Sequence, residues 1–284
     1  MITVNSPGSW SNTFSPLLHA DWNGITLTDF VYPFFIFIVG VSIVLSRNNK
    51  GTTSSKKGII LRSIKIFILG VFLGAFTESM YHFMSTGGLP SLSDIRIPGV
   101  LQRIAIVYLT CAIMFDYTNW IQQLIIMLSI LILYYVCMQF IPVPGIGPGV
   151  LEPGKNLAAY IDSILIPGSM WEGTWDPEGI LSTFPAISSG IGGMLAGYVL
   201  TTKKTIERKV IILYFAGFIC LLDSFIWEWL MPINKNLWTS TYVMHTTGWA
   251  FLTLATTTLL CDILKLHSWF KIGIIFGSNS IAIY

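Results

Sequence analysis

Hydrophobic residues are grouped into long, almost uncharged segments along most of this chain. The segments 30–45 and 121–151 contain no Asp, Glu, Lys or Arg. A run of about 20 mostly apolar residues is long enough to cross a bilayer as a helix, whereas an open strand in lipid would leave backbone groups without hydrogen bonds. The segments also lack the polar–apolar alternation of a membrane β-barrel. The pattern therefore predicts an all-α, polytopic membrane helix bundle.

The pattern divides into eight predicted spans within one transmembrane domain, residues 1–284. These spans are residues 25–46, 59–80, 98–115, 121–141, 179–200, 209–229, 238–260 and 271–284. The chain starts like the tail of an apolar helix and stops inside an apolar run at Tyr284, so we expect that it is truncated at both ends. The longest predicted connection, 142–178, is rich in Pro and Gly, and we expect a short helix at 156–166.

Composition supports the membrane assignment and narrows the possible partners. Of the 284 residues, 53% are hydrophobic and 11% are charged, against about 25% charged residues in soluble domains. The net charge of +2 gives no reason to expect a nucleic-acid partner. The four cysteines lie in or beside apolar spans, so no disulfide framework is predicted. No spacing of His, Cys or carboxylates suggests a metal site.

Basic residues predict the orientation, because cytoplasmic loops carry an excess of Lys and Arg. Twelve of the 16 basic residues lie on one predicted side, in or beside the connections 47–57, 203–209 and 265–271. The other four lie on the opposite side and are Arg96, Arg103, Lys155 and Lys235. This distribution predicts that residues 1–24 lie outside the cytoplasm. Two Gly-x-x-x-Gly pairs, at 70–74 and 193–197, further predict close helix packing.

Polar residues gather in four short segments that this topology places together on the extracytoplasmic side. The segments are residues 19–29, 96–103, 175–183 and 232–240. Polar residues at span ends are mostly solvated caps, and the tryptophans in these segments suit an interfacial aromatic belt. Asp29 and Arg103 are harder to explain in this way, because ionisable groups at membrane depth are costly and usually paired or functional. A structural ion pair of Arg103 with Asp29 or Glu178 is therefore one expectation.

His19 is the histidine best placed for chemistry. It lies just before the first predicted span, where Asp21, Asn23 and Asp29 could fix its tautomer. An ordinary loop histidine would fit this position equally well. The sequence shows no Ser-His-Asp order, phosphate-binding loop or dinucleotide fingerprint.

The four segments together resemble the transmembrane acetyltransferase family that includes heparan-α-glucosaminide N-acetyltransferase and many bacterial relatives. The matching stretches are His19-Ala-Asp-Trp-Asn-Gly24 with Asp29 to Gly40, Arg96-Ile-Pro-Gly-Val-Leu-Gln-Arg103, Asp176-Pro-Glu-Gly-Ile-Leu-Ser-Thr183 and Pro232-Ile-Asn-Lys-Asn-Leu-Trp-Thr-Ser240. Asn5 also matches the family's segment upstream of the histidine. A first helix with a Leu-Asp-x-x-Arg-Gly motif and the last helices of the family are absent from this chain.

The resemblance implies transfer of an acetyl group from cytosolic acetyl-CoA to an amino sugar or glycan on the extracytoplasmic side, without a metal. His19 matches the family's catalytic histidine, and the choice between acyl acceptor and general base stays open. Asn5 and Asp29 would position the ring or the substrate. The expected substrate or cofactor-binding residues are Arg96, Arg103, Asp176, Glu178, Asn234 and Lys235. Other expectations are an integral protein of a bacterial inner membrane and, as an option, a homo-oligomer.

Two alternatives remain open from the sequence. A transporter of small sugars would also need charged residues within the membrane, although transporter sites often lie near the midplane at broken helices. An acyltransferase with a different acceptor, such as a cell-envelope polysaccharide, would carry the same motifs.

Overall fold

The computed structural model describes residues 13–50, 55–88, 90–91, 94–171, 173–271, 273 and 277. In these residues the chain is helical and contains no strand beyond a single bridge between Val143 and Gly147. The helices are α2 (Val31–Lys50, extending the 3-10 turn Leu27–Phe30), α3 (Lys56–Thr86), α4 (Val100–Tyr117), α5 (Trp120–Phe140), α6 (Leu157–Leu165), α7 (Ile180–Thr201), α8 (Ile206–Trp227) and α9 (Ser240–Thr258).

Six of these helices are long and apolar enough to cross a membrane, and they correspond to the first six predicted spans. The all-α membrane bundle is thereby confirmed. The seventh predicted span, 238–260, is also a helix, α9, but it is not among the six. Its first half contains Ser240, His245 and three threonines, and most of the residues of α9 are buried against α2, α7 and α8. Most of the eighth predicted span, 271–284, lies outside the described residues.

Close packing of α2 against α7 depends on glycine. A Cβ atom on Gly193 would lie 1.9 Å from the carbonyl oxygen of Phe37, and one on Gly197 would lie 2.8 Å from Cβ of Val44. The predicted close approach at 193–197 is therefore present. At the other predicted pair, a Cβ on Gly70 would lie 2.4 Å from the side-chain oxygen of Gln102 in α4, whereas a Cβ on Gly74 would meet nothing closer than 3.9 Å.

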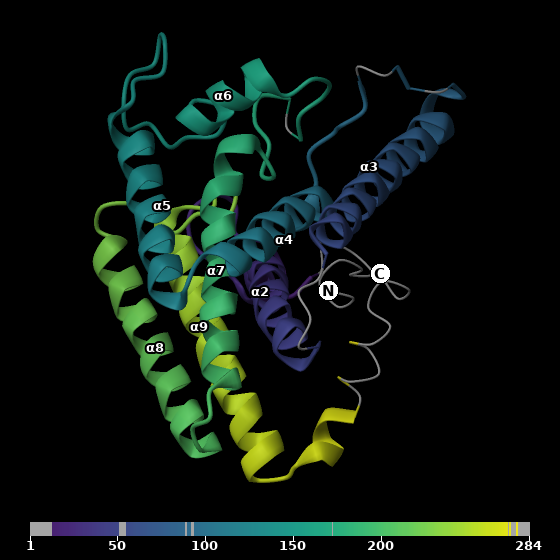
Figure 1. Ribbon diagram of the computed structural model, residues 1–284. Coiled ribbons are helices and arrows are strands. Elements are labelled where there is room, and N and C mark those ends of the chain that lie inside the picture. Colours follow the sequence, from purple (N-terminus) through teal and green to yellow (C-terminus); the bar gives the residue numbers. More distant parts are fainter. Residues whose placement is uncertain are drawn as a thin grey trace.

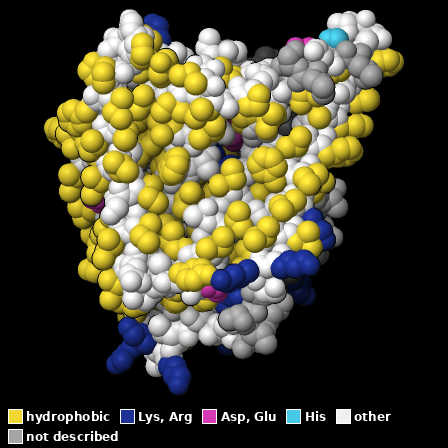
Figure 2. Space-filling view, turned by 45° about the horizontal axis from the view of Figure 1, so that its top comes forward, with side chains coloured by type: hydrophobic (Ala, Val, Ile, Leu, Met, Phe, Trp, Pro, Cys, Tyr) yellow, Lys and Arg dark blue, Asp and Glu magenta, His cyan; other side chains and the backbone are white. Residues whose placement is uncertain are grey.

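α7 is the central helix, and α6 lies across its amino-terminal end (Figure 1). The predicted short helix at 156–166 is confirmed as α6, which begins after Asn156, whose side chain accepts a hydrogen bond from the backbone N–H of Ala159. α3 leans away from the bundle and packs mainly on α4 (Figure 1). Lys and Arg side chains gather at the opposite end from α6, while the flank of the molecule is mostly hydrophobic (Figure 2).

Candidate active site at one end of the helix bundle

His19 lies at the end of the bundle where α2 begins, beside a buried acid and a lysine. Its Nδ1 atom is 2.7 Å from Oδ1 of Asp29 and 2.8 Å from Nζ of Lys235, and Lys235 Nζ lies 3.1 Å from the same Asp29 oxygen. The side chain of His19 is 48% exposed, that of Lys235 21% and that of Asp29 1%. We call these three residues the His19 cluster.

Asp29 is held rigidly by donors on its other oxygen. Oδ2 accepts hydrogen bonds from the backbone N–H of Ala20 (3.1 Å), the backbone N–H of Thr26 (3.0 Å) and the hydroxyl of Thr26 (3.1 Å). Thr26 and Asp29 form a capping box at the start of the helical turn. The backbone oxygen of Asp29 also accepts a hydrogen bond from the Tyr242 hydroxyl of α9 (2.6 Å). Only Oδ1 is therefore directed toward His19 and Lys235.

Lys235 reaches the cluster from the connection between α8 and α9, which is pinned to the loop after His19. The Asn234 side chain donates to Oδ1 of Asn23 (3.1 Å), and Gly24 N–H donates to the carbonyl of Ile233 (2.8 Å). Asn234 Oδ1 also accepts the backbone N–H of Leu237 (2.8 Å). Asn234 is fully buried, so it shapes the loop and its side chain is already occupied. The contact of Asn234 with an acceptor stays a prediction.

Arg96, Asp176, Glu178 and Trp171 form a second group, which we call the Arg96 cluster. The Arg96 guanidinium donates to both oxygens of Asp176 (2.6 Å each) and to Glu178, and it lies 5.1 Å from the centre of the Trp171 ring. Burial alone would lower the pKa of Arg96, but the hydrogen bonds and negative charges of the two acids raise it above its ordinary value. The cluster is thus a compact set of mutually compensated charges.

Arg103 lies five residues after Pro98 and is buried between the His19 cluster and the Arg96 cluster. The predicted ion pair of Arg103 with Asp29 or Glu178 is wrong. Within the described residues no carboxylate forms a salt bridge with Arg103, because Glu178 pairs with Arg96 and Asp29 pairs with Lys235. Arg103 Nη2 instead donates to the Ser182 hydroxyl and to the Gly179 carbonyl, while Nε and Nη1 have no hydrogen-bond partner in the part of the chain that the structure describes. Its guanidinium stacks 5.1 Å from the Trp238 ring centre.

Trp238 connects the segments across the site. Its fully buried ring packs edge-on against Tyr32 (4.9 Å between ring centroids) and Tyr242 (5.2 Å), in addition to Arg103. The backbone of Trp238 has φ +51°, a left-handed conformation that is rare for a bulky residue and is found most often where function requires it. The T-shaped pair of Trp22 and Trp175 joins the remaining two segments.

The structure thus brings together the predicted residues His19, Asp29, Lys235, Arg96, Asp176 and Glu178, in two separate clusters, with Arg103 between them. The predicted Asn5 lies outside the described residues. Sequence reasoning missed Thr26, although Thr26-x-x-Asp29 before an apolar run is a recognisable capping box. It also missed Trp171 and Tyr242, for which the sequence carries no local signal.

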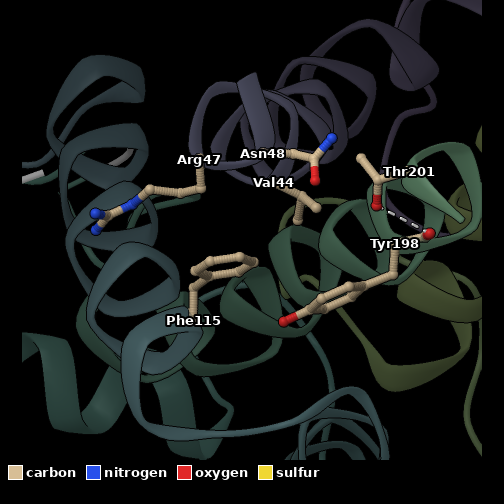
Figure 3. Close-up of a pocket in the computed structure, with 6 residues that line it drawn as sticks. All are labelled: Val44, Arg47, Asn48, Phe115, Tyr198 and Thr201. Carbon is tan, nitrogen blue, oxygen red and sulfur yellow. Dashed lines mark hydrogen bonds between the residues drawn. The ribbon is translucent and has the colours of Figure 1, made fainter. Parts of the chain in front are cut away.

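A pocket of about 360 Å³ lies at the other end of α2, lined by Val44, Arg47, Asn48, Phe115, Tyr198 and Thr201 (Figure 3). Arg47 is 18 residues after Asp29, roughly 27 Å along a helix at 1.5 Å per residue. Arg47, the one charged residue of this lining, pairs with Asp116 (3.0 Å). The pocket is therefore separate from both clusters. Among the described residues, no group of three or more His, Cys, Asp or Glu could hold a metal ion.

Comparison with known proteins gives one consistent result. A family model described as a domain of unknown function, DUF5009, matches residues 9–147. Over 94% of its length the chain is 30% identical to the heparan-alpha-glucosaminide N-acetyltransferase of Mus musculus and 29% identical to that of Homo sapiens. The chain is a homologue of these acetyltransferases.

The resemblance to heparan-alpha-glucosaminide N-acetyltransferase suggested by the four motifs is therefore confirmed. The chain spans about half the length of these curated relatives, 48% in each case. The aligned part includes nearly all of the chain, so it also includes most of the segments that build the two clusters.

Proposed function

We propose that this protein is a membrane N-acetyltransferase that transfers an acetyl group from cytosolic acetyl-CoA to an amino sugar or glycan on the extracytoplasmic side. Three independent observations support the proposal. The chain is homologous to heparan-alpha-glucosaminide N-acetyltransferases, its described residues include six helices suited to a membrane, and its polar motifs converge at one end of the bundle.

The observation that carries the proposal is the environment of His19. A buried carboxylate lies 2.7 Å from Nδ1, and the imidazole is half exposed. An acid on Nδ1 orients the ring and stabilises the positive charge that the ring gains when Nε2 takes a proton or an acyl group. The arrangement resembles the base and orienting acid of other acyl-transfer sites, without a serine nucleophile.

Two routes are compatible with this geometry. In the first, Nε2 attacks the thioester carbonyl, the C–S bond breaks, and CoA leaves as the thiolate; the acceptor amine then attacks the acyl-imidazole, loses a proton and frees the ring. In the second, the amine attacks the thioester directly while Nε2 removes its proton. Rapid quenching after mixing with labelled acetyl-CoA, without acceptor, separates them: label on His19 supports the first route.

We propose different roles for the two arginines. Arg96 holds Asp176 and Glu178, so we assign it to the structure of the site rather than to substrate. Two nitrogens of Arg103, Nε and Nη1, have no hydrogen-bond partner among the described residues, and guanidinium N–H groups bind carboxylate and phosphate well. We therefore propose Arg103 as the residue that meets an anionic group of the donor or the acceptor.

The proposed orientation puts His19 on the extracytoplasmic side of a bacterial inner membrane, and the gathering of basic side chains at the other end supports it. A membrane-impermeant thiol reagent applied to intact cells should label Asp94→Cys and should not label Lys56→Cys. The reverse labelling pattern would overturn the orientation.

The activity itself is tested with full-length protein in liposomes that contain labelled acetyl-CoA on the side of the basic residues and a panel of amino sugars on the other side. We expect labelled N-acetyl sugar on the acceptor side. Transport of sugar without acetylation, at comparable protein density, would instead support a transporter and contradict the proposal.

A further inference from the structure

The amino group of Lys235 lies over the face of the His19 imidazole. Its Nζ atom is 2.8 Å from Nδ1 and 3.5 Å from Nε2. An atom in the ring plane, on the line of the Nδ1 lone pair, would be much farther from Nε2. Lys235 therefore places a primary amino group close to the nitrogen that the proposed function assigns to the chemistry.

This position is well suited to attack on an acetyl group. An acetyl group on Nε2 is conjugated with the imidazole, so its carbonyl carbon lies near the ring plane, and a nucleophile attacks such a carbon from one face of that plane. Reacting atoms poised for attack are about 3–3.5 Å apart, and the flexible four-carbon stem of Lys235 lets Nζ approach that closely. The acceptor in the proposed reaction is also a primary amine, so Lys235 belongs to the same chemical class.

We propose that Lys235 is a self-acetylation site, whose amine takes the acetyl group when no acceptor is bound; this inference rests on the acetyl-transfer function proposed above. With the acetyl group on His19, Nζ forms a bond to the carbonyl carbon, and the bond from that carbon to Nε2 breaks. The ring recovers its lone pair and takes the proton that Nζ loses. In the direct route, Nζ attacks the thioester, the C–S bond breaks, CoA leaves as the thiolate, and Nε2 takes the proton.

Asp29 slows this side reaction. Its buried Oδ1 atom lies 3.1 Å from Nζ of Lys235, and its other oxygen is fixed by three hydrogen bonds from Ala20 and Thr26. The ammonium that pairs with this carboxylate has no lone pair, so Lys235 must lose a proton before it can attack. Self-acetylation is therefore slower than transfer to a bound acceptor amine and proceeds when the acceptor is scarce.

Acetylation of Lys235 should inactivate the site. An acetylated lysine is uncharged and can no longer form a salt bridge, so the buried carboxylate of Asp29 loses its cationic partner. The added acetyl group also lies beside the exposed imidazole of His19. The modification would thus switch the protein off when donor accumulates without acceptor.

Mass spectrometry tests the site of modification. The purified full-length protein is incubated with acetyl-CoA that carries a deuterated acetyl group, without acceptor, and is then treated with hydroxylamine, which removes acetyl groups from imidazole but not from lysine. We expect the labelled acetyl group on Lys235 in the wild type. His19→Gln should reduce this labelling by roughly 10²-fold or more, and addition of glucosamine should suppress it.

Lys155 provides the matched control within the same molecule. It is an exposed lysine that also pairs with a carboxylate, that of Glu152 (2.9 Å), so it reports uncatalysed acetylation by the thioester. Its labelling should stay low and should be the same in the wild type and in His19→Gln. Equal labelling of Lys155 and Lys235, or unchanged labelling of Lys235 in His19→Gln, would overturn the inference.

Pre-incubation with acetyl-CoA alone tests the consequence. The transfer rate of the wild type to glucosamine should decline with the time of pre-incubation, in step with the labelling of Lys235. Lys235→Arg should keep its own starting rate, because a guanidinium stays protonated and is not acetylated. Transfer to glucosamine without any label on Lys235 would overturn this inference alone, whereas absence of both would overturn the proposed function on which it rests.

Discussion

The His19 cluster and the Arg96 cluster lie at the same end of the bundle, and in both a basic side chain contacts a buried aspartate. The two clusters differ in how many of their hydrogen-bonding groups already have a partner. Arg96 forms a bidentate pair with Asp176, a further bond to Glu178 and a ring contact with Trp171. His19 is half exposed, and its Nδ1 atom contacts the buried carboxylate of Asp29 at 2.7 Å.

This difference separates a structural group from a reactive one. Asp176 also accepts the backbone N–H groups of Trp171 and Glu178, so the Arg96 cluster fixes the connection that leads into α7. Compensated charges of this kind leave little capacity for a ligand. An exposed imidazole on a buried carboxylate is the opposite case, since its outer nitrogen can reach another molecule.

The largest effect that we expect is the loss of acetyl transfer in His19→Gln. The amide keeps a hydrogen-bonding shape but can neither carry an acyl group nor take a proton near neutral pH, so the transfer rate should fall by roughly 10²- to 10⁴-fold or more. Because the His19 side chain is half exposed, the melting temperature should stay nearly unchanged. Both quantities are measured on the same preparation.

His82→Gln serves as the matched control, because His82 is exposed and its ring contacts Thr86 at the end of α3 and Gly88 just after it. It should retain wild-type activity. A near-normal transfer rate in His19→Gln would show that His19 does not take part in the reaction. The distinction between a reactive and a structural cluster would then be wrong.

Arg96→Leu should have the next largest effect, and it should act on stability. Removing the guanidinium leaves two carboxylates unpaired, one of them on the fully buried Asp176 side chain. Breaking a buried pair in this way destabilises by about 3–5 kcal/mol, which thermal unfolding in detergent would detect. Lys155→Leu, which breaks the exposed pair with Glu152, should cost about 0–1 kcal/mol.

Loss of transfer in Arg96→Leu without any loss of stability would contradict the structural role. It would mean that Arg96 binds substrate, as predicted from the sequence, and that its ion pairs with Asp176 and Glu178 open during the reaction.

The sequence predicted the positions of the helices better than the side-chain contacts between distant segments. Apolar length determines the spans, so six of them and the short helix α6 were predicted within a few residues. Asp29 was also expected as a possible partner of His19, because it lies only ten positions further along the chain. Lys235 lies 216 residues from His19, and no local pattern shows that two such distant loops meet.

The wrong partner for Arg103 has a similar cause. The order of residues along the chain does not show which arginine the acids of the next segment meet, because Arg96 lies in the loop before α4 and Arg103 lies within α4. In the structure Arg96, at the level of the loop, takes both Asp176 and Glu178. Arg103 lies deeper, at the level of Ser182. The depth of each side chain depends on how α4 and α7 are offset, which the sequence alone does not specify.

A pH dependence should appear beside the Arg96 cluster, at Asp162 of α6. This buried carboxylate accepts the backbone N–H of Ile180 at the start of α7 (2.8 Å). Burial, together with the negative charge of Asp176, raises the pKa of Asp162 to about 6, whereas an unfolded chain has a value of about 4. Between these values the folded state binds more protons, so stability should increase as the pH falls from about 6 to about 4, by roughly 2–3 kcal/mol.

Asp162→Asn keeps the oxygen that accepts the Ile180 N–H and removes the titration. The difference in melting temperature between wild type and variant should therefore vary over this pH range and level off below it. A constant difference between pH 4 and pH 7 would show that Asp162 does not titrate there.

Arg103→Met should change stability much less than Arg96→Leu, and it tests whether Arg103 belongs with the structural group or with the reactive one. Arg103 has lost its hydration, stacks on Trp238 and uses only one of its nitrogens for hydrogen bonds. Replacing an incompletely paired buried charge with an apolar side chain of similar length removes a desolvation cost along with the contacts. The net change in unfolding free energy should be about 1 kcal/mol or less, while acetyl transfer falls by at least about tenfold if an anion binds there.

Arg103→Lys keeps the charge but not the planar fork, so it should restore activity only in part. A destabilisation by Arg103→Met as large as that of Arg96→Leu would instead reveal a carboxylate partner from outside the described residues, and Arg103 would then belong with the structural group.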